Sequence, residues 1–157
     1  MKLFQSFWDP TATKYTWAMP DGHVVHIPVM IKEDKGLEID EADHLRFTYR
    51  AEVVAPRNEG RSLAANIVHS VDAWVAREMI KKASLNGVYL APIHDCFYAH
   101  PNHMNMVRQW YRECVARVAD MNLVESILSQ ISGRRQTYHK LSNDLSKDIL
   151  QSEYALS

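Results

Sequence analysis

The sequence predicts an α+β fold with a β-rich first third and a mainly helical remainder. Extended apolar segments bounded by turn residues fill residues 1–56. From Ser62 onwards, apolar residues recur instead at spacings of three and four, which is the period of a helix with one buried face. The polar residues 57–61 join the two parts, and a chain of 157 residues has the size of one domain.

The β-rich part contains two predicted strand pairs. Residues 15–19 and 23–31 are extended and flank Pro20-Asp21-Gly22, in which proline sets the first turn position and glycine accepts a positive φ. The turn formers of residues 33–36 predict a second turn. Another strand then follows around residues 45–54, where apolar and polar residues alternate.

Three helices are predicted in the remainder. The first covers residues 62–83, and its apolar residues form a wide stripe. The second begins near Pro101, because proline suits the first turn of a helix. The third begins at Asn122, where Glu125 three residues later suggests a capping box, and ends at Gly133.

A short hairpin is predicted between the first two helices, with a charged tip. Residues 88–93 and 96–99 are apolar and flank His94-Asp95. A carboxylate at such a tip is well placed to bind a hard cation such as Mg²⁺, which prefers oxygen ligands. The alternative is a solvated turn aspartate beside a structural histidine, but ionisable groups between apolar strands favour a functional site.

A second polar group lies on the first predicted helix. Asn66 and His69 share a helical face, and Asp72 lies one turn beyond His69. Taken alone, this pattern is typical of a polar stripe on an amphipathic helix, with His69 hydrogen-bonded to Asp72.

Composition limits the partners and the location. The formal net charge is −1, so the chain as a whole gives no electrostatic reason to bind nucleic acid, and any basic surface must be local or belong to another polypeptide. The spacing of Cys96 and Cys114 indicates neither a zinc site nor a disulfide framework. Because no apolar run approaches the roughly 20 residues of a membrane span, we expect no membrane association and a cytoplasmic location.

Together, the motifs resemble the C-terminal palm portion of single-subunit RNA polymerases of the phage and mitochondrial type. The resemblance rests on residues 66–72 (Asn-Ile-Val-His-Ser-Val-Asp), 91–97 (Ala-Pro-Ile-His-Asp-Cys-Phe) and the terminal 148–157, and it extends to the 19–22 turn. Their order and spacing make the match specific. The departures from the family pattern are Cys96 for Ser, Tyr154 for Phe, and Leu156-Ser157 for Phe-Ala.

The resemblance implies a role for each motif residue in a transcribing nucleotidyltransferase. Asp95 would be catalytic and would bind metal, supplying one carboxylate to a pair of Mg²⁺ ions. His94 would also be catalytic and would orient the hairpin tip or contact the RNA end. His69, Asn66 and Ser157 would contact nucleic acid, with His69 in the minor groove of the newest base pair and Ser157 packed near the site.

The resemblance also implies missing parts. In the family, a second metal-binding aspartate and a fingers helix with arginine, lysine and tyrosine lie upstream, and this chain has neither. Residues 1–157 are therefore expected to form a single partial domain, inactive without a second polypeptide. The implied partners are a DNA template, the RNA product and nucleoside triphosphates. If the gene is a bacteriophage gene, the location is the host cytoplasm or the virion.

Two other functions remain open from the residues. One is a metal-dependent phosphohydrolase that uses His69, Asp72, His94 and Asp95, which requires these four groups to converge on one metal. The other is a non-catalytic polymerase remnant. A tightly bound transition metal would favour the hydrolase, because a single carboxylate binds Mg²⁺ weakly.

Overall fold

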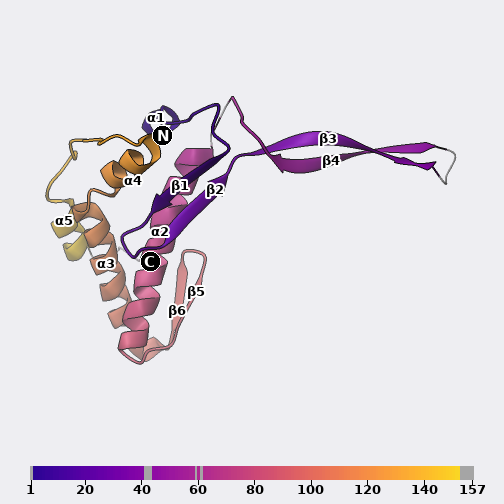
Figure 1. Cartoon of the computed structure of the whole chain (residues 1–157). Helices are drawn as coiled ribbons and strands as arrows, with labels where there is room; N and C mark the ends of the chain where they lie inside the picture. Colours follow the sequence, from indigo (N-terminus) through magenta and orange to yellow (C-terminus); the bar gives the residue numbers. More distant parts are fainter. Residues whose placement is uncertain (1, 41–43, 59, 61, 153–157) are drawn as a thin grey trace.

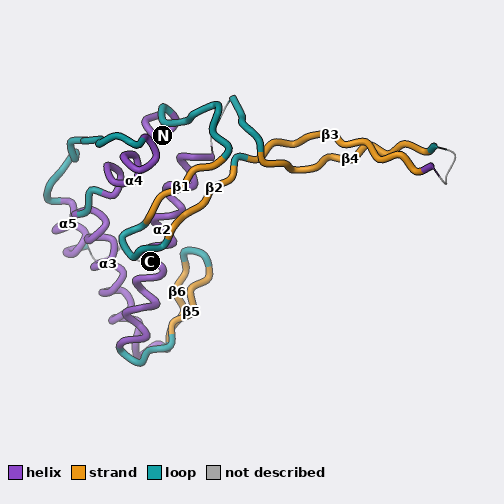
Figure 2. Tube along the Cα trace, viewed as in Figure 1, coloured by secondary structure: helices purple, strands orange, loops and turns teal. Residues whose placement is uncertain are grey.

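The computed structural model describes residues 2–40, 44–58, 60 and 62–152, and it confirms the α+β class (Figures 1 and 2). A short helix, α1 (Lys2–Gln5), is followed by two antiparallel strand pairs and then by helices that enclose a third pair. Within the described ranges, none of the helices combines the length and the apolar character needed to cross a membrane.

The first strand pair is the predicted hairpin and packs on the central helix. β1 (Lys14–Ala18) pairs with β2 (Val24–Pro28), and Gly22 in the turn has the positive φ of 81° that the sequence requires. Asp21 in the same turn accepts a hydrogen bond from the Arg77 guanidinium of the central helix at 2.5 Å, which lowers the pKa of the Asp21 carboxyl. This contact fixes the turn on the helix.

The second strand pair is a long arm that projects from the body (Figure 1). β3 (Met30–Ile39) and β4 (Leu45–Val54) pair along ten positions. The predicted turn at residues 33–36 is wrong, because these residues lie within β3, where Asp34 forms an ion pair with Arg50 across the strands at 3.0 Å. The two strands pair as far as Ile39 and Leu45 instead.

The central helix, α2 (Ser62–Leu85), carries the core. Its buried side chains include Leu63, Ile67, Trp74 and Met79, in the predicted stripe. Trp17 of β1 packs against this face, and its indole N–H donates to the buried Ser70 hydroxyl at 3.2 Å.

A second long helix lies beside α2. The 3₁₀ turn Pro101–His103 leads into α3 (Met104–Asp120), consistent with the helix start predicted at proline. Two ion pairs join α2 to α3, one between Lys82 and Glu113 at 2.7 Å and one between Glu78 and Arg117 at 2.9 Å. α2 and α3 therefore form a rigid pair that supports the hairpin between them in sequence.

Two further helices complete the body. α4 (Leu123–Ser132) ends at Gly133 with a φ of 63°, as predicted, and α5 (Leu145–Gln151) follows a loop. The predicted capping box is wrong: the Asn122 side chain makes no capping hydrogen bond, and Glu125 accepts the backbone N–H of Tyr138 at 2.7 Å. Glu125 thus holds the loop after α4.

Candidate active site

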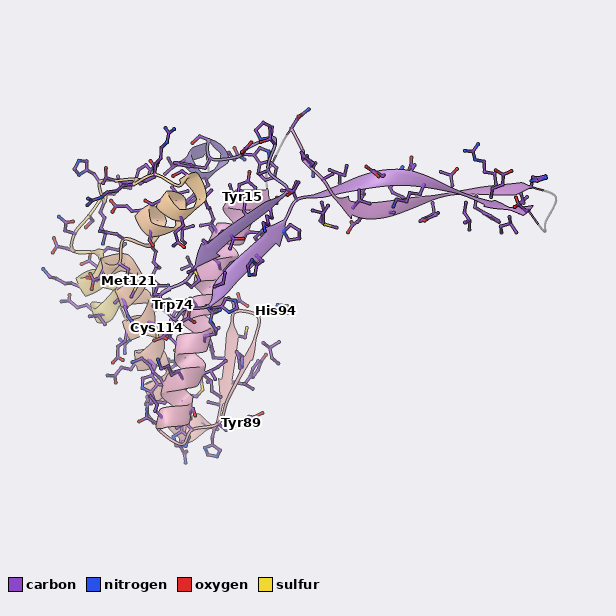
Figure 3. All side chains as sticks on the ribbon, in the orientation of Figure 1. Tyr15, Trp74, Tyr89, His94, Cys114 and Met121 are labelled. Carbon is purple, nitrogen blue, oxygen red and sulfur yellow. The ribbon has the colours of Figure 1, made fainter. Side chains whose placement is uncertain are left out.

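The charged hairpin forms as the sequence predicts. β5 (Leu90–Ile93) and β6 (Cys96–Ala99) pair antiparallel, and Ile93 opposite Cys96 leaves only His94 and Asp95 in the loop. Figure 3 shows His94 at the tip and Tyr89 at the opposite end of the hairpin.

The tight loop requires an unusual backbone at His94. Its φ is 56°, a region that glycine tolerates best and that histidine enters more readily than most residues. A positive φ at the first position of a two-residue loop is the requirement of a type II′ turn, which normally has glycine there. Histidine therefore occupies a position where glycine would be less strained. Backbone strain of this kind is common at functional sites.

The hairpin packs on the body with one face only. Leu90, Phe97 and Ala99 are partly buried against the core. On the other face, Ile93 and Tyr98 each keep 57% of their surface exposed. Phe97 is also in contact with Tyr111 of α3, with ring centroids 5.9 Å apart and planes tilted by 56°. The hairpin thus holds its tip against the two helices.

The tip closes one side of a cavity of about 710 Å³ between α2 and α3. α2 contributes His69 and Asp72, the tip contributes His94 and Asp95, and α3 contributes Tyr111. The remaining lining is apolar: Val71, Ala73, Val75, Ala76, Phe97, Val115 and Val118. Small alanines on α2 leave room here, so the cavity has an apolar wall and polar groups from three elements.

The structure brings together four of the side chains that the sequence selects. His69, Asp72, His94 and Asp95 are exposed and line the same cavity, so substrate or solvent can reach all of them. Asn66 is half-buried on α2 and is not part of the lining. Ser157 lies outside the described residues.

Tyr111 is a member of the site that the sequence analysis did not identify as such. Its spacing from Val107, Cys114 and Val118 is helical, and this pattern alone predicts a residue of the buried stripe of its helix. Burial raises the pKa of the Tyr111 phenol, and the negative charges of Asp72 and then Asp95 raise it further. The ordinary pKa of tyrosine already lies well above neutral, so the phenol that lines this cavity with the two carboxylates carries no charge at neutral pH.

The carboxylate oxygens of the cavity suit part of the ligand set of a magnesium site. Asp72 and Asp95 offer carboxylate oxygens that are open to solvent, and Mg²⁺ binds through one or two carboxylates together with substrate phosphates and water. A pair of Mg²⁺ ions needs further ligands from elsewhere.

Another group with metal-ligand chemistry lies on the arm. Glu38, Asp40 and His44 are exposed and bring their ligand atoms within 4.8 Å of one another. The His44 imidazole lies 3.4 Å from each carboxylate, which are contacts that an exposed histidine and two acids make without a metal. These residues are on a different element from the cavity.

Comparison with known proteins supplies the family context. The sequence model described as DNA-dependent RNA polymerase matches residues 9–155 of this chain. A probable DNA-directed RNA polymerase of Gelasinospora sp. (strain G114) is 35% identical over 78 residues. The matched segment is 50% of this chain and 9% of that relative, so the chain corresponds to a small part of its length.

Proposed function

Because this chain belongs to the single-subunit, phage-type DNA-dependent RNA polymerase family, we propose that it is a C-terminal catalytic fragment or subunit of such an enzyme. The observation that carries the proposal is the position of Asp95. It occupies the tip of a tight hairpin and faces a cavity that it shares with His69 of α2.

Asp95 would hold one side of a Mg²⁺ pair, and a carboxylate on another polypeptide would hold the other. When bound, Mg²⁺ lowers the pKa of the attacking RNA 3′-hydroxyl and neutralises the leaving pyrophosphate. His94 lines the same cavity, where it would orient the tip or contact the RNA end. The α2–α3 pair keeps both groups in place, because two ion pairs and a buried core join these helices.

The partners follow from the reaction: a DNA template, the RNA product, nucleoside triphosphates and the rest of the polymerase. Exposed apolar side chains support a polypeptide partner, since contiguous exposed apolar surface marks interaction sites. They lie on the outer face of the β5–β6 hairpin, at Ile93 and Tyr98, and on the arm, at Leu37, Phe47 and Tyr49.

We also propose that Asn66 and Ser157 contact nucleic acid. The enzyme would act in the cytoplasm, which is that of the host if a phage encodes it.

His69 is assigned to the minor groove of the newest base pair. There a single side chain can check pair shape through acceptors common to all four pairs. His69→Ala in the assembled polymerase should reduce correct nucleotide addition by about 3- to 10-fold, the value of one hydrogen bond, and should raise misincorporation. His139→Ala, at an exposed histidine outside the cavity lining, is the matched control. Unchanged rates and fidelity in His69→Ala would refute the proposed role of His69 in the minor groove.

A metal-dependent phosphohydrolase remains the second candidate, because His69, Asp72, His94 and Asp95 line one cavity. Two imidazoles with two carboxylates suit a transition metal better than Mg²⁺. Metal analysis of the purified chain separates the candidates. A stoichiometric transition metal that survives dialysis would favour the hydrolase, and its absence together with millimolar Mg²⁺ binding would favour the polymerase.

A further inference from the structure

We propose that Tyr111 is a positioning residue of the metal site: its ring braces the Asp95-bearing tip through Phe97, and its hydroxyl provides a neutral hydrogen-bond donor on the opposite cavity wall. This inference rests on the proposed function of Asp95. It adds a residue from α3 to a site otherwise built from α2 and the hairpin.

The first support is the packing between α3 and the hairpin. Tyr111 and Phe97 form a tilted ring pair with centroids 5.9 Å apart, a geometry that stabilises aromatic pairs. Phe97 lies two residues after Asp95 on β6, so the ring that Tyr111 contacts belongs to the strand that carries the tip. With its other face exposed, the hairpin depends on such contacts for its position relative to α2.

The second support is the position of Tyr111 in the cavity. Tyr111, Val115 and Val118 follow one another at helical spacing and form the α3 wall, in which Tyr111 has the only polar side chain. The wall of α2 opposite carries Asp72, and the tip carries Asp95. The phenol therefore enters a space shared with two carboxylates, and their charges disfavour its ionisation.

A hydrogen-bond donor in this position could support a metal-binding carboxylate. Carboxylates that bind metal are generally held by a hydrogen bond to a neighbouring group, and loss of that group costs about 10- to 100-fold in metal affinity or activity. Tyr111 keeps its proton and can donate to a cavity carboxylate or to a water bound there. Phenylalanine at this position would retain the ring contact and lose only the donor.

The test uses the full chain and Mn²⁺ as a paramagnetic substitute for Mg²⁺, with broadening of backbone amide signals at the tip as the readout. Tyr111→Phe should require about 10-fold more Mn²⁺ for half-maximal broadening near Asp95, because the substitution removes the donor proposed to support the metal-bound carboxylate. Tyr98→Phe, on the exposed face of the same hairpin, should match the wild type. Tyr111→Leu should in addition shift the amide signals of the tip, because the ring pair is lost.

The outcomes separate this inference from the function on which it rests. If Asp95→Asn abolishes the broadening while Tyr111→Phe binds Mn²⁺ like the wild type, the role of Tyr111 is wrong and that of Asp95 stands. If the wild-type tip shows no broadening, the metal assignment of Asp95 fails, and this inference fails with it. An equal loss in Tyr98→Phe would also overturn it, since the effect would not be specific to the cavity.

Discussion

Asp95→Asn is expected to slow nucleotide addition by the assembled polymerase about 100-fold or more. The amide has nearly the shape of the carboxylate but lacks its charge, so the change removes the negative charge proposed to hold the metal and should leave the hairpin unaltered. Metal stabilisation of the transition state is worth several kcal/mol, and each 1.36 kcal/mol is about a factor of ten in rate. Because Asp95 is exposed at the tip, the free energy of unfolding should change little.

Single-nucleotide addition measured by rapid quench gives this rate directly. Asp120→Asn is the matched control, because Asp120 is an exposed carboxylate at the end of α3 and is not part of the cavity lining. It should extend RNA at the wild-type rate. Near-normal elongation by Asp95→Asn would refute the assignment of Asp95 as a metal ligand.

The chain alone is expected to give no RNA extension. Among the residues that line the cavity, only Asp72 of α2 and Asp95 of the hairpin tip carry carboxylates. Mg²⁺ binds tightly only when protein anions and substrate phosphates share it. The net charge of −1 also gives no long-range attraction for a nucleic-acid duplex. Under the proposed function, we therefore expect catalysis to need a polypeptide with the second aspartate and the triphosphate-binding fingers.

A primer-extension assay with template, Mg²⁺ and nucleotides tests this requirement. The purified chain should yield no product, and addition of the partner polypeptide should restore extension. A mixture of the partner with Asp95→Asn chain controls for activity of the partner itself. Robust extension by the chain alone would mean that its active site is complete and lies elsewhere.

The parts of the fold that depend on local chemistry could be predicted from the sequence. Pro20-Asp21-Gly22 determined the first hairpin, because only a few residue types suit those turn positions. The apolar stripe of α2 had helical spacing, and Gly133 marked the end of α4. The apolar arms around His94-Asp95 placed that pair at a hairpin tip. These features need no knowledge of distant contacts.

The wrong predictions concern residues whose conformation or hydrogen bonding depends on another part of the chain. Residues 33–36 look like a turn locally, but ten cross-strand pairs with β4 keep them extended. Glu125 has the spacing of a capping residue, yet it binds the backbone of Tyr138, thirteen residues away.

Tyr111 illustrates a different limit of the sequence. Periodicity shows that a side chain faces inward, but it does not show whether that side chain meets the core or opens on a cavity. Only the packing of α3 against the hairpin and α2 reveals that Tyr111 lines one cavity with Asp72 and Asp95 and that their charges act on its phenol.

Iron-mediated cleavage of the assembled polymerase tests most directly whether Asp95 holds a catalytic metal. Fe²⁺ substituted for Mg²⁺ and treated with ascorbate and peroxide releases hydroxyl radicals that cut the backbone near the bound ion. We expect cuts at His94 and Asp95 and on the neighbouring turn of α2 around His69, suppressed by excess Mg²⁺ and by Asp95→Asn. Cleavage confined to other parts of the chain, such as the Glu38, Asp40 and His44 group of the arm, would contradict this account.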